Sequence, residues 1–179
     1  STKLFGSSPQ MAPLDMESDC TEPPPQPLPA EDLEHFIRHG YLLLPSVTGP
    51  ELNVEICKKA SSICARGPRA AAQLGDGVLG AVPQLQGVLA AAPVRGALEA
   101  VVGKDYVLHG HRHLHVSSTH EQMWHKDSYW GYRRLRHHRP RWCMLLYYPQ
   151  ETTLEMGPTH VLSGSQYWTL DSEQMPVGE

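Results

Sequence analysis

The stretch Trp142-Cys-Met-Leu-Leu-Tyr-Tyr148 is apolar or aromatic at every position, and it predicts a β-strand. On its N-terminal side, residues 105–118 alternate in polarity, as expected of a strand with two different faces. On its C-terminal side, residues 159–162 form a short and partly β-branched segment. The part of the chain after Lys104 therefore has the character of a sheet.

A short helix is predicted well before these strands. Leu33, Phe36 and Ile37 recur at helical spacing, and Gly40 follows them as a stop signal. The next segment, residues 41–45, is apolar and ends in a proline, which predicts a brief strand. A helix that leads into a strand is therefore expected at the start of the ordered chain.

A second and longer helix is predicted to begin at Pro50, because proline suits the first turn of a helix. Its inner face would carry Leu52, Ile56, Ala60, Ile63 and Cys64. Shorter helices are expected around residues 85–89 and 93–103, and residues 66–80 are expected to form a loop. Helices thus come first and strands follow.

This order predicts the α+β class, with helices that buttress an antiparallel sheet. Residues 1–29 contain the run Glu22-Pro-Pro-Pro-Gln-Pro-Leu-Pro29, which cannot form a helix and supplies no core. We expect residues 1–29 to be a disordered, Pro-rich leader. Residues 30–179 are expected to be the N-terminal portion of one folded domain.

Composition excludes several functional classes. The 179 residues carry a formal net charge of −4, which gives no general attraction to nucleic acid or to an anionic membrane. No apolar run reaches the roughly 20 residues of a membrane-spanning helix, and no secretory signal is visible. The sequence also lacks the G-x-S-x-G elbow of many hydrolases. We expect a cytoplasmic protein without nucleic-acid or membrane partners.

The candidate chemistry lies in Gln122-Met-Trp-His-Lys-Asp127. His125 and Asp127 are two residues apart, and such residues share one face of a strand. An imidazole beside a carboxylate suits Fe(II), and a second histidine would leave three coordination positions for a co-substrate and O₂. Gln122 is a candidate cofactor-binding residue, although it needs a bulge or bend to face the same pocket as His125.

Three blocks of the sequence, in this order, resemble the phytanoyl-CoA dioxygenase family. The first is the helix that leads into Gly40-Tyr41 and the apolar strand. The second is Trp124-His125-x-Asp127, and the third is the segment from Gly157-Pro158-Thr159 to Gly164-Ser165. The resemblance covers approximately residues 30–168.

The resemblance implies a double-stranded β-helix, a cupin-like jelly roll, in which His125 and Asp127 are the first two iron ligands. It further implies a dioxygenase that uses Fe(II), 2-oxoglutarate and O₂ to hydroxylate a small-molecule or acyl-CoA-like substrate. The family's second histidine and its 2-oxoglutarate-binding arginine follow many tens of residues later. We therefore expect this chain to be truncated and inactive alone. Gln166 stands where relatives commonly carry a structural histidine.

Alternatives remain beside this interpretation. His109, His111, His113 and His115 would share one strand face, either as a metal-binding strip or as a polar surface. The basic run 133–141 is either a solvated loop or a binding site for an anionic group. His160 is an alternative metal ligand. If the chain does not belong to a dioxygenase, the alternative hypotheses are a non-catalytic jelly-roll binding module, an inactive truncated isoform, or another cupin-type metal protein.

Overall fold

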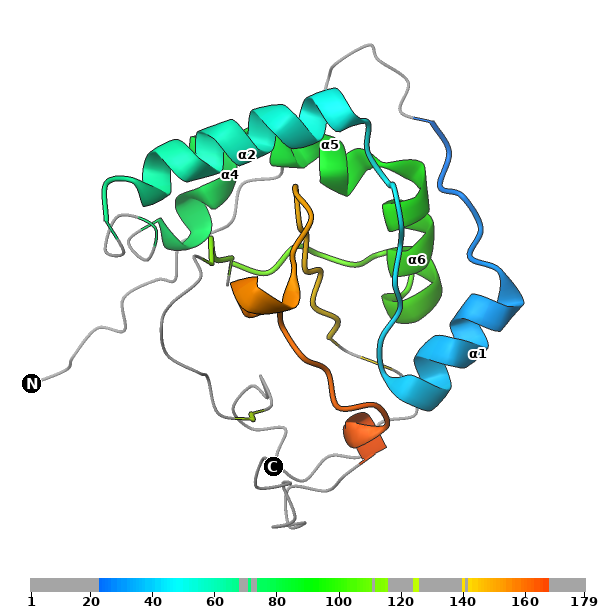
Figure 1. The fold of residues 1–179 in the computed structure, drawn as a ribbon. Helices are drawn as coiled ribbons and strands as arrows, with labels where there is room; N and C mark the ends of the chain where they lie inside the picture. Colours follow the sequence, from blue (N-terminus) through cyan, green and yellow to red (C-terminus); the bar gives the residue numbers. More distant parts are fainter. Residues whose placement is uncertain are drawn as a thin grey trace, which may run out of the picture.

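Helices form the regular secondary structure of the described residues in this computed structural model. The described residues are 23–67, 71, 74–110, 112–115, 124–125, 140 and 142–167. The elements are α1 (Ala30–His39), α2 (Pro50–Cys64), η1 (Gly75–Gly77), α4 (Val78–Ala81), α5 (Leu85–Ala90), α6 (Ala92–Val102), η2 (Leu154–Met156) and η3 (Ser165–Tyr167), where η marks a 3-10 helix. Figure 1 shows α2 running along α4 and α5, with α6 and α1 below them on one side.

The first helix, α1, forms where its apolar spacing predicts it. Glu31 and Asp32 occupy its first turn and Arg38 its last, so these charges interact favourably with the helix dipole at both ends. Gly40 ends the helix in the left-handed conformation at φ 80°, and its N–H donates to the carbonyl of Phe36 at 2.8 Å. The predicted glycine stop is therefore confirmed.

The core lies against the predicted inner face of α2. Ile56 and Ile63 are only 2% and 7% exposed, and they form one buried cluster with Val82 and Val88. The partly buried side chains around this cluster are Leu52, Leu74, Ala81, Leu85, Leu114 and Tyr147. Burial of these apolar groups stabilises the packing of α2 on the segment that contains α4 and α5.

The smaller helices follow the sequence pattern with one exception. The predicted segments around residues 85–89 and 93–103 are confirmed as α5 and α6. In the predicted loop over residues 66–80, however, η1 and the first part of α4 are helical. Val78 explains the difference, because its burial gives this glycine-rich stretch an apolar anchor.

The structure corrects the prediction of a sheet. Among the described residues there is no β-strand, and segments 106–109, 112–115 and 142–148 have no regular secondary structure. Consecutive side chains Met144, Leu145 and Leu146 are 58%, 39% and 44% exposed, so this part of the segment is not enclosed between two layers as the central strand of a jelly roll would be. The prediction of an α+β jelly roll is therefore wrong. An apolar pattern favours an extended backbone, but it does not provide the neighbouring strand that a sheet needs.

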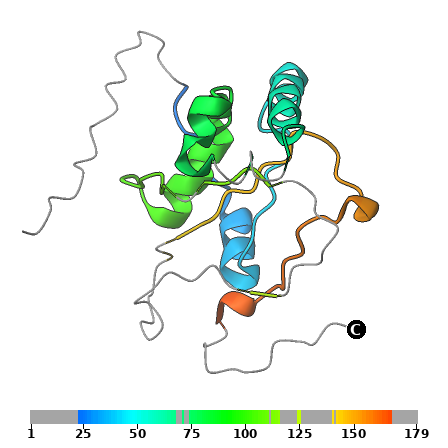
Figure 2. The same ribbon diagram turned by 90° about the vertical axis from the view of Figure 1, so that its left-hand side faces the viewer.

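Side-chain hydrogen bonds, instead of a strand ladder, attach the apolar segment 142–148 to α2. The hydroxyl groups of Tyr147 and Thr48 both donate to Oδ1 of Asn53, each at 2.5 Å. Just beyond the segment, the thiol of Cys57 donates to Oε1 of Gln150 at 3.2 Å. The segment consequently crosses the molecule close to α2, as Figure 2 shows from a second direction.

Residues 23–29, the described part of the expected leader, lie against α6. The N–H of Gln26 donates to the carbonyl of Ala92 at 2.9 Å, and Nη1 of Arg95 donates to the carbonyl of Pro23 at 3.0 Å. Gly96 is buried at this contact, where a Cβ would overlap the carbonyl of Gln26. A glycine in α6 therefore permits the close approach of the two backbones.

None of the helices in the described part of the chain has the length and apolar composition needed to cross a lipid bilayer.

Gly96→Ala should lower the free energy of unfolding by about 1–3 kcal/mol, because the added methyl group overlaps a backbone atom that cannot rotate away. Urea unfolding measures this change. Gly80→Ala in α4 is the matched control, since nothing lies within 4 Å of a Cβ added there. The control should be neutral or up to about 1 kcal/mol more stable through helix propensity. Equal stability of the two variants would contradict the contact between residues 23–29 and α6.

Candidate functional site

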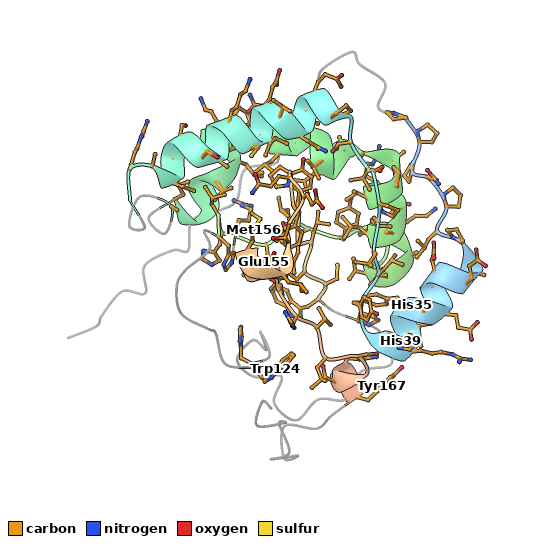
Figure 3. The ribbon with its side chains drawn as sticks, viewed as in Figure 1. His35, His39, Trp124, Glu155, Met156 and Tyr167 are labelled. Carbon is orange, nitrogen blue, oxygen red and sulfur yellow. The ribbon has the colours of Figure 1, made fainter. Side chains whose placement is uncertain are left out.

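The predicted metal-binding motif lies partly within the described residues. Trp124 and His125 are described and are both exposed, whereas Gln122 and Asp127 lie outside the described residues. Figure 3 shows Trp124 well apart from His35 and His39. No group of three or more His, Cys, Asp or Glu side chains within the described ranges is placed to hold a metal ion. Of the two ligands that the motif predicts, His125 is therefore the one that the structure describes, and it is exposed.

The alternating histidines do not form a single metal strip in the described residues. His109 stands edge-on to Trp142, with ring centroids 4.7 Å apart. His113 and His115 have ring centroids 6.0 Å apart, and His111 lies outside the described residues. The described members of this series, His109, His113 and His115, are all exposed. Of the basic run 133–141, the structure describes only Pro140.

The structure joins the first and third blocks of the sequence at the carbonyl end of α1. Nε2 of Gln166 donates to the carbonyls of Ile37 and Arg38, at 3.0 and 3.3 Å. The N–H of Gly164 donates to the carbonyl of His39 at 3.0 Å, and the hydroxyl of Tyr167 donates to the carbonyl of Ile37. The last carbonyls of a helix have no partner within the helix, so this turn satisfies groups that would otherwise rely on water.

We call residues 163–167 the capping turn. Figures 1 and 2 both show it beside the lower end of α1. Nδ1 of His39 also lies 2.8 Å from Oγ of Ser163, which adds a side-chain hydrogen bond to the junction. A Cβ on Gly40 would collide with the side chain of Gln166, so this glycine both ends the helix and leaves room for the turn.

The resemblance marked Gln166 as a position where members of that family commonly carry a structural histidine. It did not predict which groups Gln166 contacts. The available signal was local: a glycine-terminated helix has open carbonyl groups, and an amide next to a Gly-Ser turn is a suitable donor. The two segments are separated by more than 120 residues, so their pairing could not be deduced from spacing. The side-chain amide of Gln166 supplies the N–H donor for this cap.

The titration of two further groups limits what they can do. Burial raises the pKa of the Cys143 thiol, which therefore stays protonated at neutral pH. Because the thiolate is the nucleophile and the metal ligand, Cys143 is a poor candidate for either role. A side-chain hydrogen bond from Thr153, followed by one from its own backbone N–H, lowers the pKa of Glu155. Glu155 is exposed on η2 and is ionised at neutral pH (Figure 3).

Comparisons with models of protein families, with curated proteins and with solved structures found no match to this chain.

Gln166→Ala should loosen the capping turn, because the carbonyl of Arg38 loses its side-chain donor and the carbonyl of Ile37 keeps only the hydroxyl of Tyr167. A loss of about 1–2 kcal/mol of local stability corresponds to a roughly 5- to 30-fold faster amide exchange at Gly164. Hydrogen–deuterium exchange of the peptide that contains Gly164 measures it. Glu34→Gln is the matched control, since it removes only the exposed ion pair with Arg38. If both variants exchange like the unmodified chain, the cap does not hold the turn.

Proposed function

We propose that this chain is part of an Fe(II)- and 2-oxoglutarate-dependent dioxygenase in which His125 and Asp127 are two of the iron ligands. The observation that carries the proposal is the H-x-D spacing within Trp124-His125-Lys-Asp127. The three-block resemblance to the phytanoyl-CoA dioxygenase family supports it. The contact between the first and third blocks, at α1 and the capping turn, is compatible with their belonging to one structural unit.

The ligand proposal does not need a regular sheet. Two residues separated by one other have Cα atoms at most about 7 Å apart, whatever the backbone conformation. An imidazole and a carboxylate attached at that separation can reach a common ion. This closeness follows from the sequence alone, so it holds although the predicted jelly roll is wrong. It therefore supports the pairing of His125 with Asp127.

The donor chemistry fits a divalent transition metal. Imidazole nitrogen and carboxylate oxygen are the donors of the two-histidine, one-carboxylate sites that bind Fe(II). The side chain of His125 is exposed, so an ion can approach it without prior unfolding. The remaining coordination positions would be taken by a further protein ligand, by the co-substrate or by water.

An Fe(II) ion held there would supply O₂ activation: O₂ would be the oxidant, and 2-oxoglutarate would be oxidised to succinate and CO₂ as a C–H bond of the substrate is hydroxylated. The contribution of His125 and Asp127 is to fix the ion from one side and to leave its other positions open. The neutral imidazole of His125 provides a lone pair, whereas the carboxylate of Asp127 offsets part of the ionic charge. A small molecule or an acyl-CoA-like compound is the substrate class that the resemblance suggests.

Asp127→Ala and His125→Ala should each weaken Fe(II) binding by at least about 100-fold, because loss of a direct ligand exceeds the 10- to 100-fold effects typical of outer-shell changes. Anaerobic titration of the protein with Fe(II) measures the affinity. Succinate release from 2-oxoglutarate measures turnover, which both variants should abolish.

His160→Ala is the control, since His160 is an exposed histidine downstream of the motif. It should bind Fe(II) and release succinate at unchanged levels. Normal succinate release by Asp127→Ala would refute the ligand assignment. Fe(II) binding that depends on both motif residues, but without any 2-oxoglutarate turnover, would instead indicate a non-catalytic metal protein.

A further inference from the structure

Two histidines of α1 lie one helical turn apart, and we propose that they form a second, independent binding site for a divalent transition-metal ion. His35 and His39 are at positions i and i+4, which place their side chains on the same face of the helix. Their ring centroids are 4.5 Å apart, and the ring planes are tilted by 33°. Figure 3 shows the two labelled side chains next to one another at the end of α1.

The spacing of the two rings matches that of neighbouring imidazole ligands. A Zn(II) ion lies about 2.1 Å from a ligating nitrogen, and hence about 3.2 Å from the centroid of that ring. Two such rings at a ligand–metal–ligand angle of roughly 90–110° have centroids about 4.5–5.2 Å apart. The separation of His35 and His39 lies at the lower end of this range, so α1 holds the two rings at a spacing compatible with bidentate binding.

The capping turn provides a second and independent observation. Nδ1 of His39 hydrogen-bonds to Oγ of Ser163, a hydroxyl that can accept a hydrogen bond as well as donate one. In the tautomer that donates from Nδ1, the lone pair resides on Nε2, as in metal-binding histidines whose other nitrogen is held by an outer partner. The Tyr41 ring stands edge-on to His35, with ring centroids 5.0 Å apart. Both imidazoles are half-buried and held by neighbours.

The donor set specifies the class of ion. Two imidazoles favour Zn(II), Ni(II) or Cu(II) over Mg(II) or Ca(II), which prefer oxygen ligands. The nearby carboxylate of Glu34 is already paired with Arg38 at 2.6 Å. Two protein ligands are enough for chelation, and water can occupy the remaining coordination positions of the ion. The second imidazole binds intramolecularly, which raises the affinity above that of a single histidine.

The test is a titration of the whole chain with ZnCl₂ alone, followed by NMR of the histidine ring nitrogens. The ring signals of His35 and His39 should shift together, at a Zn(II) concentration at least tenfold below that needed to shift His160. His35→Ala should weaken the response of His39 at least tenfold. This variant leaves the hydrogen bond between His39 and Ser163 in place.

Two control variants make the result specific. The double variant Glu34→His with His35→Ala keeps the number of histidines but places the pair five residues apart, and it should bind as weakly as His35→Ala. His125→Ala should leave the response of His35 and His39 unchanged, which separates this site from the proposed iron site. If His39 responds equally with and without His35, or if neither ring shifts before His160, the proposal is overturned.

Discussion

The carbonyl end of α1 is the junction on which the arrangement of the described chain depends. A helix ends with carbonyl groups that have no partner inside the helix, and those groups need donors. Gly40 supplies one donor by turning into the left-handed conformation, and the capping turn supplies the others through Gly164, Gln166 and Tyr167. Residues separated by 124 positions are thereby held together, and the motif that contains His125 lies on the chain between them.

The helices could be predicted because their signals are local. The spacing of Leu33 and Phe36 before Gly40, and the face of α2 that contains Ile56, both follow from the 3.6-residue period. The sheet could not be predicted in the same way. The apolar run 142–148 favours an extended backbone. The formation of a sheet also depends on a partner strand, which no local pattern identifies. In the structure its Tyr147 bonds to Asn53 of α2 instead.

The candidate sites show the same division between local and distant information. The proximity of His125 to Asp127 is guaranteed by the chain itself, so it could be inferred without knowledge of the fold. The pairing of His35 with His39 is equally local, yet it becomes meaningful only once a helix is established and Ser163 is found beside it. The role of Gln166 required the structure, because its partners are the backbone carbonyls of a remote helix.

The two proposed metal sites would serve different purposes. Mixed imidazole and carboxylate donors at His125 and Asp127 suit an ion with open positions for reactants. Two imidazoles on α1, next to the capping turn, suit an ion that would hold the histidine rings at the helix junction. Neither site depends on the other, since they use different residues in different parts of the chain.

The most direct measurement is anomalous X-ray scattering from crystals of the natural protein grown with Mn(II) in place of Fe(II). If His125 and Asp127 bind the same ion, a manganese peak will lie within bonding distance, about 2.2 Å, of both the His125 imidazole and the Asp127 carboxylate. A peak bound by only one of these groups, or a model in which the two side chains point apart with no ion between them, would contradict it.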